Sequence, residues 1–211
     1  MSTGFQYIFD NASVIDYERQ PIVAQTQSRD GTIRATSRGG SVWRFKVTYA
    51  AGKPWNELRP ILDSIDLKGR HTSDTVSFNS TGQSWIFPYG GASADITGWT
   101  VNNISGNTCT LAGTGSHSPV ASEKLFAAGD LIQLGTNGHI YTVTADVTKT
   151  LGVDPTLTLH RPILESNATY TLTIGPTVSF KLFCTKQPGV RIFDHNLATF
   201  DGSFEFVEDM T

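Results

Sequence analysis

A regular alternation of apolar and polar residues marks the clearest strand of the chain. Over residues 43–49 every second side chain is large and apolar, and the side chains between them are polar: Trp43, Phe45, Val47 and Tyr49 against Arg44, Lys46 and Thr48. Successive side chains of a strand point to opposite faces of a sheet, so the pattern predicts one buried face and one wet face. Upstream, Asp30-Gly31 favours a type I′ hairpin turn, because both residues tolerate positive φ. Residues 22–49 are therefore predicted to form consecutive antiparallel strands.

A helical period replaces the alternation after residue 54. Trp55, Leu58, Leu62 and Ile65 share one face of a helix over residues 55–67, and Gly69 supplies a stop. An interior proline costs about 3 kcal/mol, so Pro60 predicts either a kink or a helix that begins near Pro60. Residues 75–78 and 85–87 then favour short strands, and residues 88–91 break the pattern.

From residue 90 to residue 164, short strand patterns recur at regular intervals between clusters of turn residues. The predicted strands cover residues 98–104, 108–111, 130–134, 139–145 and 156–160. Five short strands with no helix between them favour a small closed barrel, because closure removes the exposed strand edges.

Three later segments return to the pattern of the first section. They cover residues 169–174, 178–184 and 203–207, and each alternates apolar with polar side chains. The sequence therefore predicts a discontinuous first domain, residues 1–89 and 165–211, interrupted by an inserted domain over residues 90–164.

Composition narrows the classes of partner. The 211 residues carry 16 Lys and Arg against 19 Asp and Glu, so the formal net charge is -3, which does not favour binding to duplex DNA. The sequence contains no run of about 20 apolar residues and no basic, then apolar, leader, so we expect a soluble protein made in a cytoplasm. Cys109 and Cys184 lie in alternating apolar segments and are expected to be buried and reduced.

The motifs of common enzyme classes are absent from the sequence. It contains no phosphate-binding Gly-x-x-x-x-Gly-Lys-Ser/Thr, no dinucleotide-binding Gly-x-Gly-x-x-Gly after a strand and no His-Glu-x-x-His. Ser116 in Gly113–His117 is misplaced for a nucleophile elbow, which has the form Gly-x-Ser-x-Gly. The five histidines lack the close spacing of metal ligands; they are His71, His117, His139, His160 and His195.

Isolated carboxylates remain the only candidates for acid–base chemistry, namely Asp130, Glu165, Asp194 and Asp201. Asp130 follows Ala128-Gly129 and is better explained as a turn residue whose side chain caps the backbone. Asp194-His195 near Asp201 resembles an oriented base, but a polar turn between two strands explains it more simply. We therefore predict that the protein is not an enzyme and that it has no catalytic, cofactor-binding or metal-binding residues.

Two groups of residues favour binding. Arginines on the early hairpin form a modest basic patch for an acidic partner, although solvated strand faces have the same composition; they are Arg29, Arg34, Arg38 and Arg44. Trp99 and Tyr141 in the insertion are candidates for stacking on sugars or bases. The alternative is that both rings fill the core of the barrel.

Several segments together resemble a known family. They are the helix that ends in Ile61-Leu62-Asp63-Ser64, the strand through Val76 and Phe78, the run from Ala128 to Leu134, and the segments 140–143, 157–159 and 162–163. In this order they resemble the distal tail proteins of long-tailed bacteriophages, in the subclass with an inserted oligonucleotide/oligosaccharide-binding-type (OB) barrel. Residues 113–122 and the aromatic-rich end near Phe193 and Phe200 match nothing in that family.

The resemblance implies a mainly β protein, with a β-sandwich or split-barrel-like belt domain carrying one helix and a small OB-like barrel outside it. The belt would close into a hexameric ring in the virion tail and join the tail tube protein, the tape-measure end and the tail-tip proteins, after synthesis in the host bacterial cytoplasm. A ring subunit needs self-complementary sheet edges and no reactive site. We accordingly expect residues 22–49 to contact a neighbouring subunit, with Arg29, Arg34 and Trp43 as candidate interface residues.

Other functions stay open at this point. One is a carbohydrate-binding module of the tail tip that grips host surface glycans through Trp99 and Tyr141. Another is a tube-terminating or other minor tail subunit, because related β-folds recur in tails and fold alone does not separate them. An enzyme is the third.

Overall fold

The computed structural model describes residues 4–27, 29–31, 33–50, 52–69, 71–80, 82–91, 99–112, 124–136, 138–150, 153–193 and 196–211, with the backbone alone for residues 25, 26 and 33–39. Over these ranges the protein is mainly β, with two α-helices and several antiparallel sheets. The chain divides into two compact units. We call residues 1–76 with 180–211 the split unit, and residues 77–179 the inserted unit.

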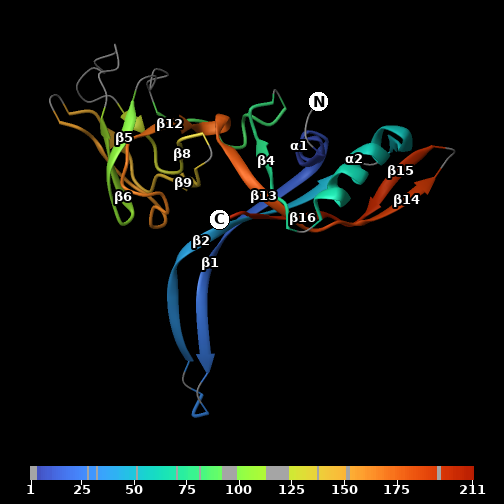
Figure 1. The fold of residues 1–211 in the computed structure, drawn as a ribbon, viewed down its shortest axis with the longest axis horizontal. Coiled ribbons are helices and arrows are strands. Elements are labelled where there is room, and N and C mark those ends of the chain that lie inside the picture. The colour runs from blue at the N-terminus through green and yellow to red at the C-terminus, as the bar shows by residue number, and fades with distance from the viewer. Residues whose placement is uncertain are drawn as a thin grey trace. The chain divides into compact units, whose positions relative to one another are not determined.

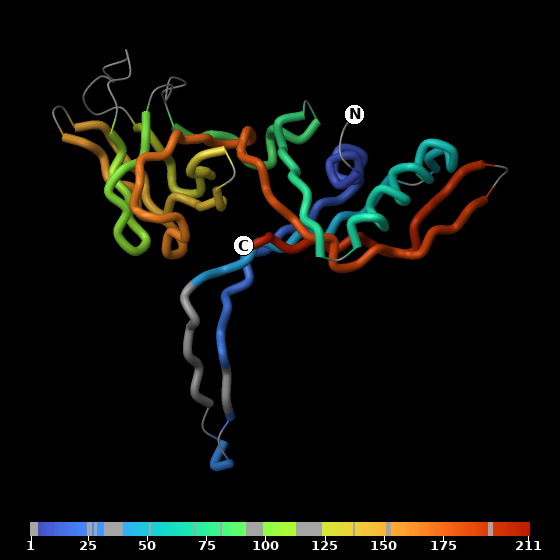
Figure 2. The backbone as a smooth tube through the Cα atoms, viewed as in Figure 1, coloured from blue at the N-terminus to red at the C-terminus, as the bar shows by residue number. Residues whose placement is uncertain are grey.

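The split unit is built on an antiparallel sheet with the strand order β1-β2-β16-β13-β4 (Figure 1). Its strands are β1 (Ala12–Gln27), β2 (Ile33–Tyr49), β16 (Phe204–Glu208), β13 (Ser179–Lys186) and β4 (Asp74–Ser77). Segments from both ends of the sequence thus meet in one sheet, and Figure 2 shows the blue and red parts of the chain side by side there.

The alternation predicted for residues 43–49 is confirmed. Trp43, Phe45, Val47 and Tyr49 are buried, whereas Arg44 and Lys46 are exposed. The buried face packs on α1 (Gly4–Asp10), where Phe9 meets Phe45 with ring centroids 5.7 Å apart and Phe206 at 5.0 Å.

Helix α1 was not predicted, so the expectation of one helix in this domain is wrong. Its signal is short but present, since Phe5, Ile8 and Phe9 recur at helical spacing and are all buried. A Cβ on Gly4 would lie 2.5 Å from Ser64 Oγ, so glycine allows α1 to approach the second helix closely.

Helix α2 (Trp55–Lys68) confirms the helix predicted from Trp55, and it begins there and not near Pro60. Leu58, Leu62 and Ile65 form its buried face, and Gly69 follows it with a φ of 59°. A second, smaller sheet in the split unit has the order β14-β15-β3, with β14 (Gly189–Phe193), β15 (Leu197–Asp201) and β3 (Lys53–Pro54).

The inserted unit contains a six-stranded antiparallel sheet and a short strand pair. The sheet has the order β11-β6-β5-β12-β8-β9 and the pair joins β10 to β7. The bounds are β5 (Thr100–Ser105), β6 (Thr108–Ala112), β7 (Lys124–Phe126), β8 (Leu131–Leu134), β9 (Ile140–Thr142), β10 (Val147–Thr148), β11 (Thr156–Thr158) and β12 (Tyr170–Ile174), followed by a 3-10 turn at Gly175–Thr177.

The six-stranded sheet returns on itself. Its two outer strands in that order, β11 and β9, are linked by a bridge between Val143 and Leu159 and by Thr144 N, which donates to Thr158 O at 2.9 Å. The interior is apolar and includes Cys109, whose burial, like that of Cys184, agrees with the prediction from the sequence.

The inserted unit is longer at both ends than the predicted insertion of residues 90–164. Strand β12 was expected in the first domain, but it pairs with β5 and β8. Residues 85–87 are not the predicted strand; they lie in a series of turns, and Phe87 packs edge-on against Phe78 with centroids 5.1 Å apart. The assignment of β12 comes from pairing partners distant in sequence, whereas residues 85–87 differ through the local turns that precede them.

Candidate assembly surface

Strands β1 and β2 continue well past the sheet to which they belong. They pair with each other from Ala12↔Tyr49 to Gln27↔Ile33, whereas β16 pairs with β2 only from Phe204↔Val47 to Val207↔Arg44 (Figure 1). From Arg19 to Gln27 the ribbon spans roughly 30 Å at about 3.4 Å per residue. We call residues 19–43 the arm. A two-stranded ribbon is only marginally stable alone, so the arm has the form of a segment that is completed by another surface.

The turn of the arm differs from the predicted type I′ turn. Gly31 has a φ of +84°, but among the described residues Asn103 is the only non-glycine with a positive φ, so Asp30 does not adopt the conformation that a type I′ turn requires. The last pair is Gln27↔Ile33, which makes the connection longer than two residues. The exposed Arg29 lies in this connection.

Aromatic rings hold the root of the arm. Trp43 packs edge-on against Phe180 with centroids 5.5 Å apart, stacks on Phe45 at 6.3 Å and meets Tyr17 at 6.1 Å. Arg19 covers the Trp43 ring from 5.6 Å. These contacts anchor the root of the arm in the core of the split unit, since each aromatic pair adds about 0.5–1.5 kcal/mol beyond its buried area.

Glu208 closes the sheet at the same place. Strand β16 runs out beside Arg44, and the buried Glu208 carboxylate accepts a hydrogen bond from Trp43 N at 3.2 Å. The carboxylate replaces the carbonyl that a further strand residue would have supplied. The sheet therefore ends, and the two-stranded arm begins, at a defined residue.

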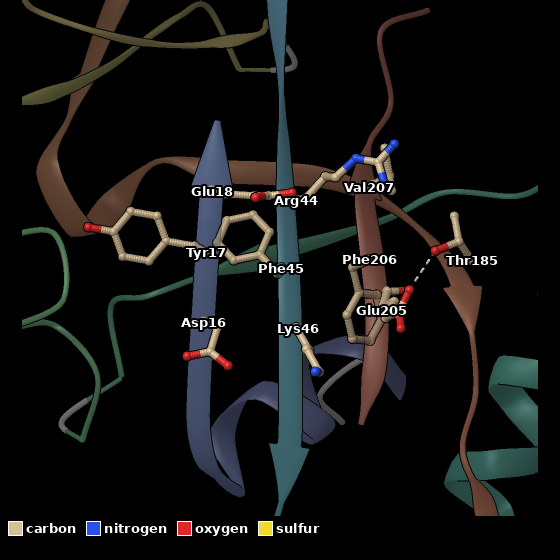
Figure 3. A pocket seen from close by; sticks show the side chains of 10 residues that line it. All are labelled: Asp16, Tyr17, Glu18, Arg44, Phe45, Lys46, Thr185, Glu205, Phe206 and Val207. Atoms are coloured by element: carbon tan, nitrogen blue, oxygen red, sulfur yellow. Dashed lines mark hydrogen bonds between the residues drawn. The ribbon is translucent and has the colours of Figure 1, made fainter. Parts of the chain in front are cut away.

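The opposite face of this sheet is polar and carries rows of charge. Asp16 and Glu18 from β1 lie beside Lys46 and Arg44 from β2, and Glu205 from β16 lies on the other side of Lys46 (Figure 3). Together with Thr185 and Val207 these residues line a hollow of about 380 Å³. We call this surface the charged face.

Most charged side chains on the charged face alternate in sign across the strands but, among the described residues, do not close into ion pairs. Glu205 pairs with Lys186 at 3.0 Å, but no ion pair within the described part of the chain involves Asp16, Glu18, Arg44 or Lys46. Acidic and basic rows that lie side by side without ion pairs are complementary to a partner surface that carries the same alternation.

Apolar side chains are also exposed on the outer strand. Val14 is 49% exposed and Tyr17 is 50% exposed, and β1 has no second strand neighbour within the described residues. An exposed edge with apolar side chains is a site for pairing with another chain. Pro21 and the register shift between Pro21 and Val23 limit such pairing to the part of β1 before the arm turns away.

The structure places the three predicted interface residues in different environments. Arg29 is exposed, as an interface requires, and the backbone of Arg34 lies in β2 opposite Thr26, with its side chain outside the described residues. Trp43 is wrong as a contact residue, because it is 2% exposed and belongs to the core at the root of the arm. The acidic rows of the charged face were not predicted, although the polar side of the same alternation indicates them.

Trp99 and Tyr141 do not form an exposed stacking platform. Trp99 is 4% exposed and lies under the Lys149 ammonium, which is 4.4 Å from the ring centroid, and Tyr141 is fully buried. Both rings lie in the apolar core of the inserted unit, which agrees with the alternative that they fill a core.

Tyr141 belongs to a buried polar network. Its hydroxyl donates to Glu165 Oε2 at 2.5 Å and accepts from Leu164 N at 2.9 Å, while Glu165 Oε1 accepts from His139 N at 2.7 Å. Burial alone raises the pKa of Glu165. The hydrogen bond between Glu165 Oε1 and the ring nitrogen His139 Nδ1, at 3.0 Å, together with those from Tyr141 and His139 N, outweighs burial and holds the pKa below its usual value. Burial also raises the pKa of Tyr141. The network joins the segment before β12 to strand β9.

The remaining acid candidates have structural roles. Asp130 is 3% exposed and accepts hydrogen bonds from Gly90 N and Ala127 N, at 2.7 and 2.8 Å, which agrees with its interpretation as a backbone-capping residue. Asp201 forms an exposed ion pair with Arg191 at 2.8 Å. Asp194, His195 and Ser116 lie outside the described residues. Within the described ranges, no group of three or more acidic, His or Cys side chains is arranged to hold a metal ion.

No protein-family model matches the sequence, and no curated protein matches it significantly. In the described part of the chain, neither helix is long and apolar enough to cross a membrane.

Proposed function

We propose that this protein is a structural subunit of a bacteriophage tail, which assembles with copies of itself into a ring at the distal end of the tail tube. In this role the split unit is the belt that forms the ring, and the inserted unit is an OB-like barrel attached to it. The ring joins the tail tube protein and the tape-measure end to the tail-tip proteins, and six copies are expected.

The arm is the observation that carries this proposal. An isolated enzyme or transport protein gains little from a ribbon of roughly 30 Å whose two strands have, among the described residues, no sheet neighbour except each other, because such a ribbon contributes no core and exposes its edges. A subunit of an assembly uses that edge, since a contact between two different surfaces of identical subunits generates a closed ring when the rotation closes.

The charged face and the outer strand supply further surfaces of the required kind. Asp16 and Glu18 alternate with exposed Val14 and Tyr17 along β1, so one strand offers both an apolar contact and a charge pattern to a neighbour. The polar network of Glu165 and Tyr141 and the cap at Asp130 are used to hold the inserted unit together. The resemblance of the sequence to distal tail proteins supplies the identity of the assembly.

The test is the mass and symmetry of the purified protein. Negative-stain electron microscopy at high protein concentration and native mass spectrometry are expected to show closed rings of six copies. A protein that stays monomeric over the whole concentration range, both alone and with purified tail tubes, would contradict the proposal.

A further inference from the structure

Trp85 is the most exposed aromatic side chain among the described residues. It is 73% exposed in the inserted unit, whereas the other described tryptophans are at least partly buried, with Trp43 at 2% and Trp99 at 4%. Leaving so large an apolar surface in water forgoes the stabilisation that its burial would bring, since aromatic side chains bury about 150–250 Å² each. The exposed indole is therefore a candidate for contact with a ligand or partner.

The turns around Trp85 hold its ring outward. Gln83 and Phe87, two residues to either side, are each 7% exposed and anchor the segment. Ser84 N donates to Ser80 O at 3.0 Å, and Ile86 N donates to Gln83 O at 2.9 Å. The chain therefore buries the neighbours of Trp85 and presents the indole.

The indole itself is oriented by a hydrogen bond. Trp85 Nε1 donates to Gly82 O at 2.9 Å, so the polar atom of the ring is already satisfied within the turn. What the side chain offers to a partner is the apolar ring, held in one orientation. A ligand that stacks on it pays little to order it, because rigid aromatic groups lose little conformational entropy on binding.

The chemistry around the ring favours an uncharged, hydroxyl-rich ligand. From Thr75 to Ala94 the sequence has no Asp, Glu, Lys, Arg or His. The polar side chains that are close to Trp85 in sequence and reach the surface carry an amide or a hydroxyl group: Asn79, Ser80 and Ser84. Single-stranded nucleic acid also stacks on aromatic rings, but its phosphates require lysine or arginine nearby. The C–H face of a pyranose ring satisfies an indole, and its hydroxyl groups satisfy amide and hydroxyl side chains.

We propose that Trp85, with the uncharged turn of residues 82–87 around it, is a binding site for a neutral saccharide. The site is distinct from the pair Trp99 and Tyr141, whose rings are buried, and it goes beyond the role of a ring subunit. The ligand class is a neutral hexose or N-acetylhexosamine oligomer that stacks one sugar ring on the indole.

The test is a calorimetric titration of the full chain with maltohexaose and with the β-1,4-linked hexamer of N-acetylglucosamine. Both are used up to roughly 10 mM, which covers dissociation constants in the millimolar range. The wild-type protein is expected to bind at least one of them, with a change in tryptophan fluorescence that saturates at the same concentration. Trp85→Ala is expected to weaken binding at least about tenfold, or about 1.4 kcal/mol, while Trp85→Phe retains most of it.

A matched control is Leu164→Ala, which removes another exposed apolar side chain of the inserted unit and is expected to leave the affinity unchanged. Circular dichroism and the melting temperature verify that each variant is folded. Absence of binding to both oligomers, or equal binding by wild type and Trp85→Ala, would overturn the proposal. A change of oligomeric mass in Trp85→Ala without saccharide binding would assign the ring to a protein contact instead.

Discussion

The split unit and the inserted unit are both made of antiparallel strands, but they treat the edges of their sheets differently. In the inserted unit the outer strands β9 and β11 are joined through Val143 and Leu159, so the sheet returns on itself. In the split unit β1 has no second neighbour within the described residues and extends, with β2, into the arm. Closing a sheet stabilises one chain, whereas leaving an edge open provides for contact with another. The comparison predicts that mutations in the two units affect different properties.

Removing the arm is expected to have the largest effect, and on assembly. Replacing residues 21–41 with Asn-Gly joins Gln20 to Val42, which face each other across the ribbon, through a two-residue hairpin turn. The shortened chain is expected to lose ring formation, with an apparent dissociation constant raised at least about 1,000-fold, or about 4 kcal/mol. Analytical ultracentrifugation measures the change.

The same variant keeps the aromatic contacts at the root of the arm, so its near-ultraviolet circular dichroism is expected to match that of the wild type. If the shortened chain forms rings of normal mass, the arm is not required for assembly. A protein that fails to fold without residues 21–41 would show that the arm supports the monomer.

Within the sheet of the split unit, substitutions on the buried face of β2 and on the exposed edge strand β1 are expected to change the free energy of unfolding by different amounts. Phe45→Ala removes a buried ring that packs on Phe9 and Phe180, and is expected to lower the free energy of unfolding of the split unit by about 3–4 kcal/mol. Val14→Ala, on the exposed edge, is expected to change it by less than about 0.5 kcal/mol. Urea denaturation gives both values, and equal values would mean that the assigned faces are wrong.

A substitution in the network at Tyr141 tests whether the inserted unit unfolds independently of the split unit. Tyr141→Phe leaves Glu165 and Leu164 N each without one hydrogen-bond partner, which is expected to cost about 1–3 kcal/mol. Hydrogen exchange followed by mass spectrometry is expected to show faster exchange in β8, β9 and β12 and no change in β2 and β16. Faster exchange in both units would mean that they unfold as one.

The stability of the inserted unit is expected to change with pH because of Glu165. Its pKa is held below the usual value of 4.5, so the folded state binds the proton less readily than the unfolded chain. The stabilisation is present above pH 4.5 and is lost as the pH falls through the pKa of the folded state. Glu165→Gln is expected to make the melting temperature depend less steeply on pH. Melting temperatures of both proteins between about pH 3 and pH 6 measure it, and identical slopes would contradict the assignment.

Lys149→Ala is expected to have a small effect on the stability of the inserted unit. It removes the ammonium that covers Trp99 at 4.4 Å, an interaction that contributes about 0.5–1 kcal/mol at a partly exposed site. The fluorescence of Trp99 is expected to shift to longer wavelength as the ring becomes accessible to water. Acrylamide quenching in a Trp85→Phe background separates this signal from that of the exposed ring, and unchanged quenching would contradict the contact.

Local patterns in the sequence predict local features of the structure. The alternation over residues 43–49 identifies both faces of β2, the helical period from Trp55 identifies α2, and Gly129-Asp130 identifies a capped turn. The turn at Asp30-Gly31 is placed correctly although its type is wrong, because the connection is longer than two residues.

Features that depend on distant partners could not be predicted. Strand β12 resembles the strands of the split unit in its alternation, and only its pairing with β5 and β8 assigns it to the inserted unit. The apolar run Trp85-Ile86-Phe87 resembles a strand, but the structure exposes Trp85 in a series of turns. The charged face also required the register of three strands, since Asp16, Lys46 and Glu205 are far apart in sequence.

The order β1-β2-β16-β13-β4 places the strand that is synthesised last of the five at the centre of the sheet. During translation, residues 204–208 leave the ribosome only after the whole inserted unit, whose segments are contiguous and can fold first. Until then β2 has no neighbour on that side, and Trp43 N has no Glu208 to receive its hydrogen bond. The root of the arm is therefore completed in one late step. Under the proposed function, a partly made chain would have no finished belt with which to enter and block a growing particle.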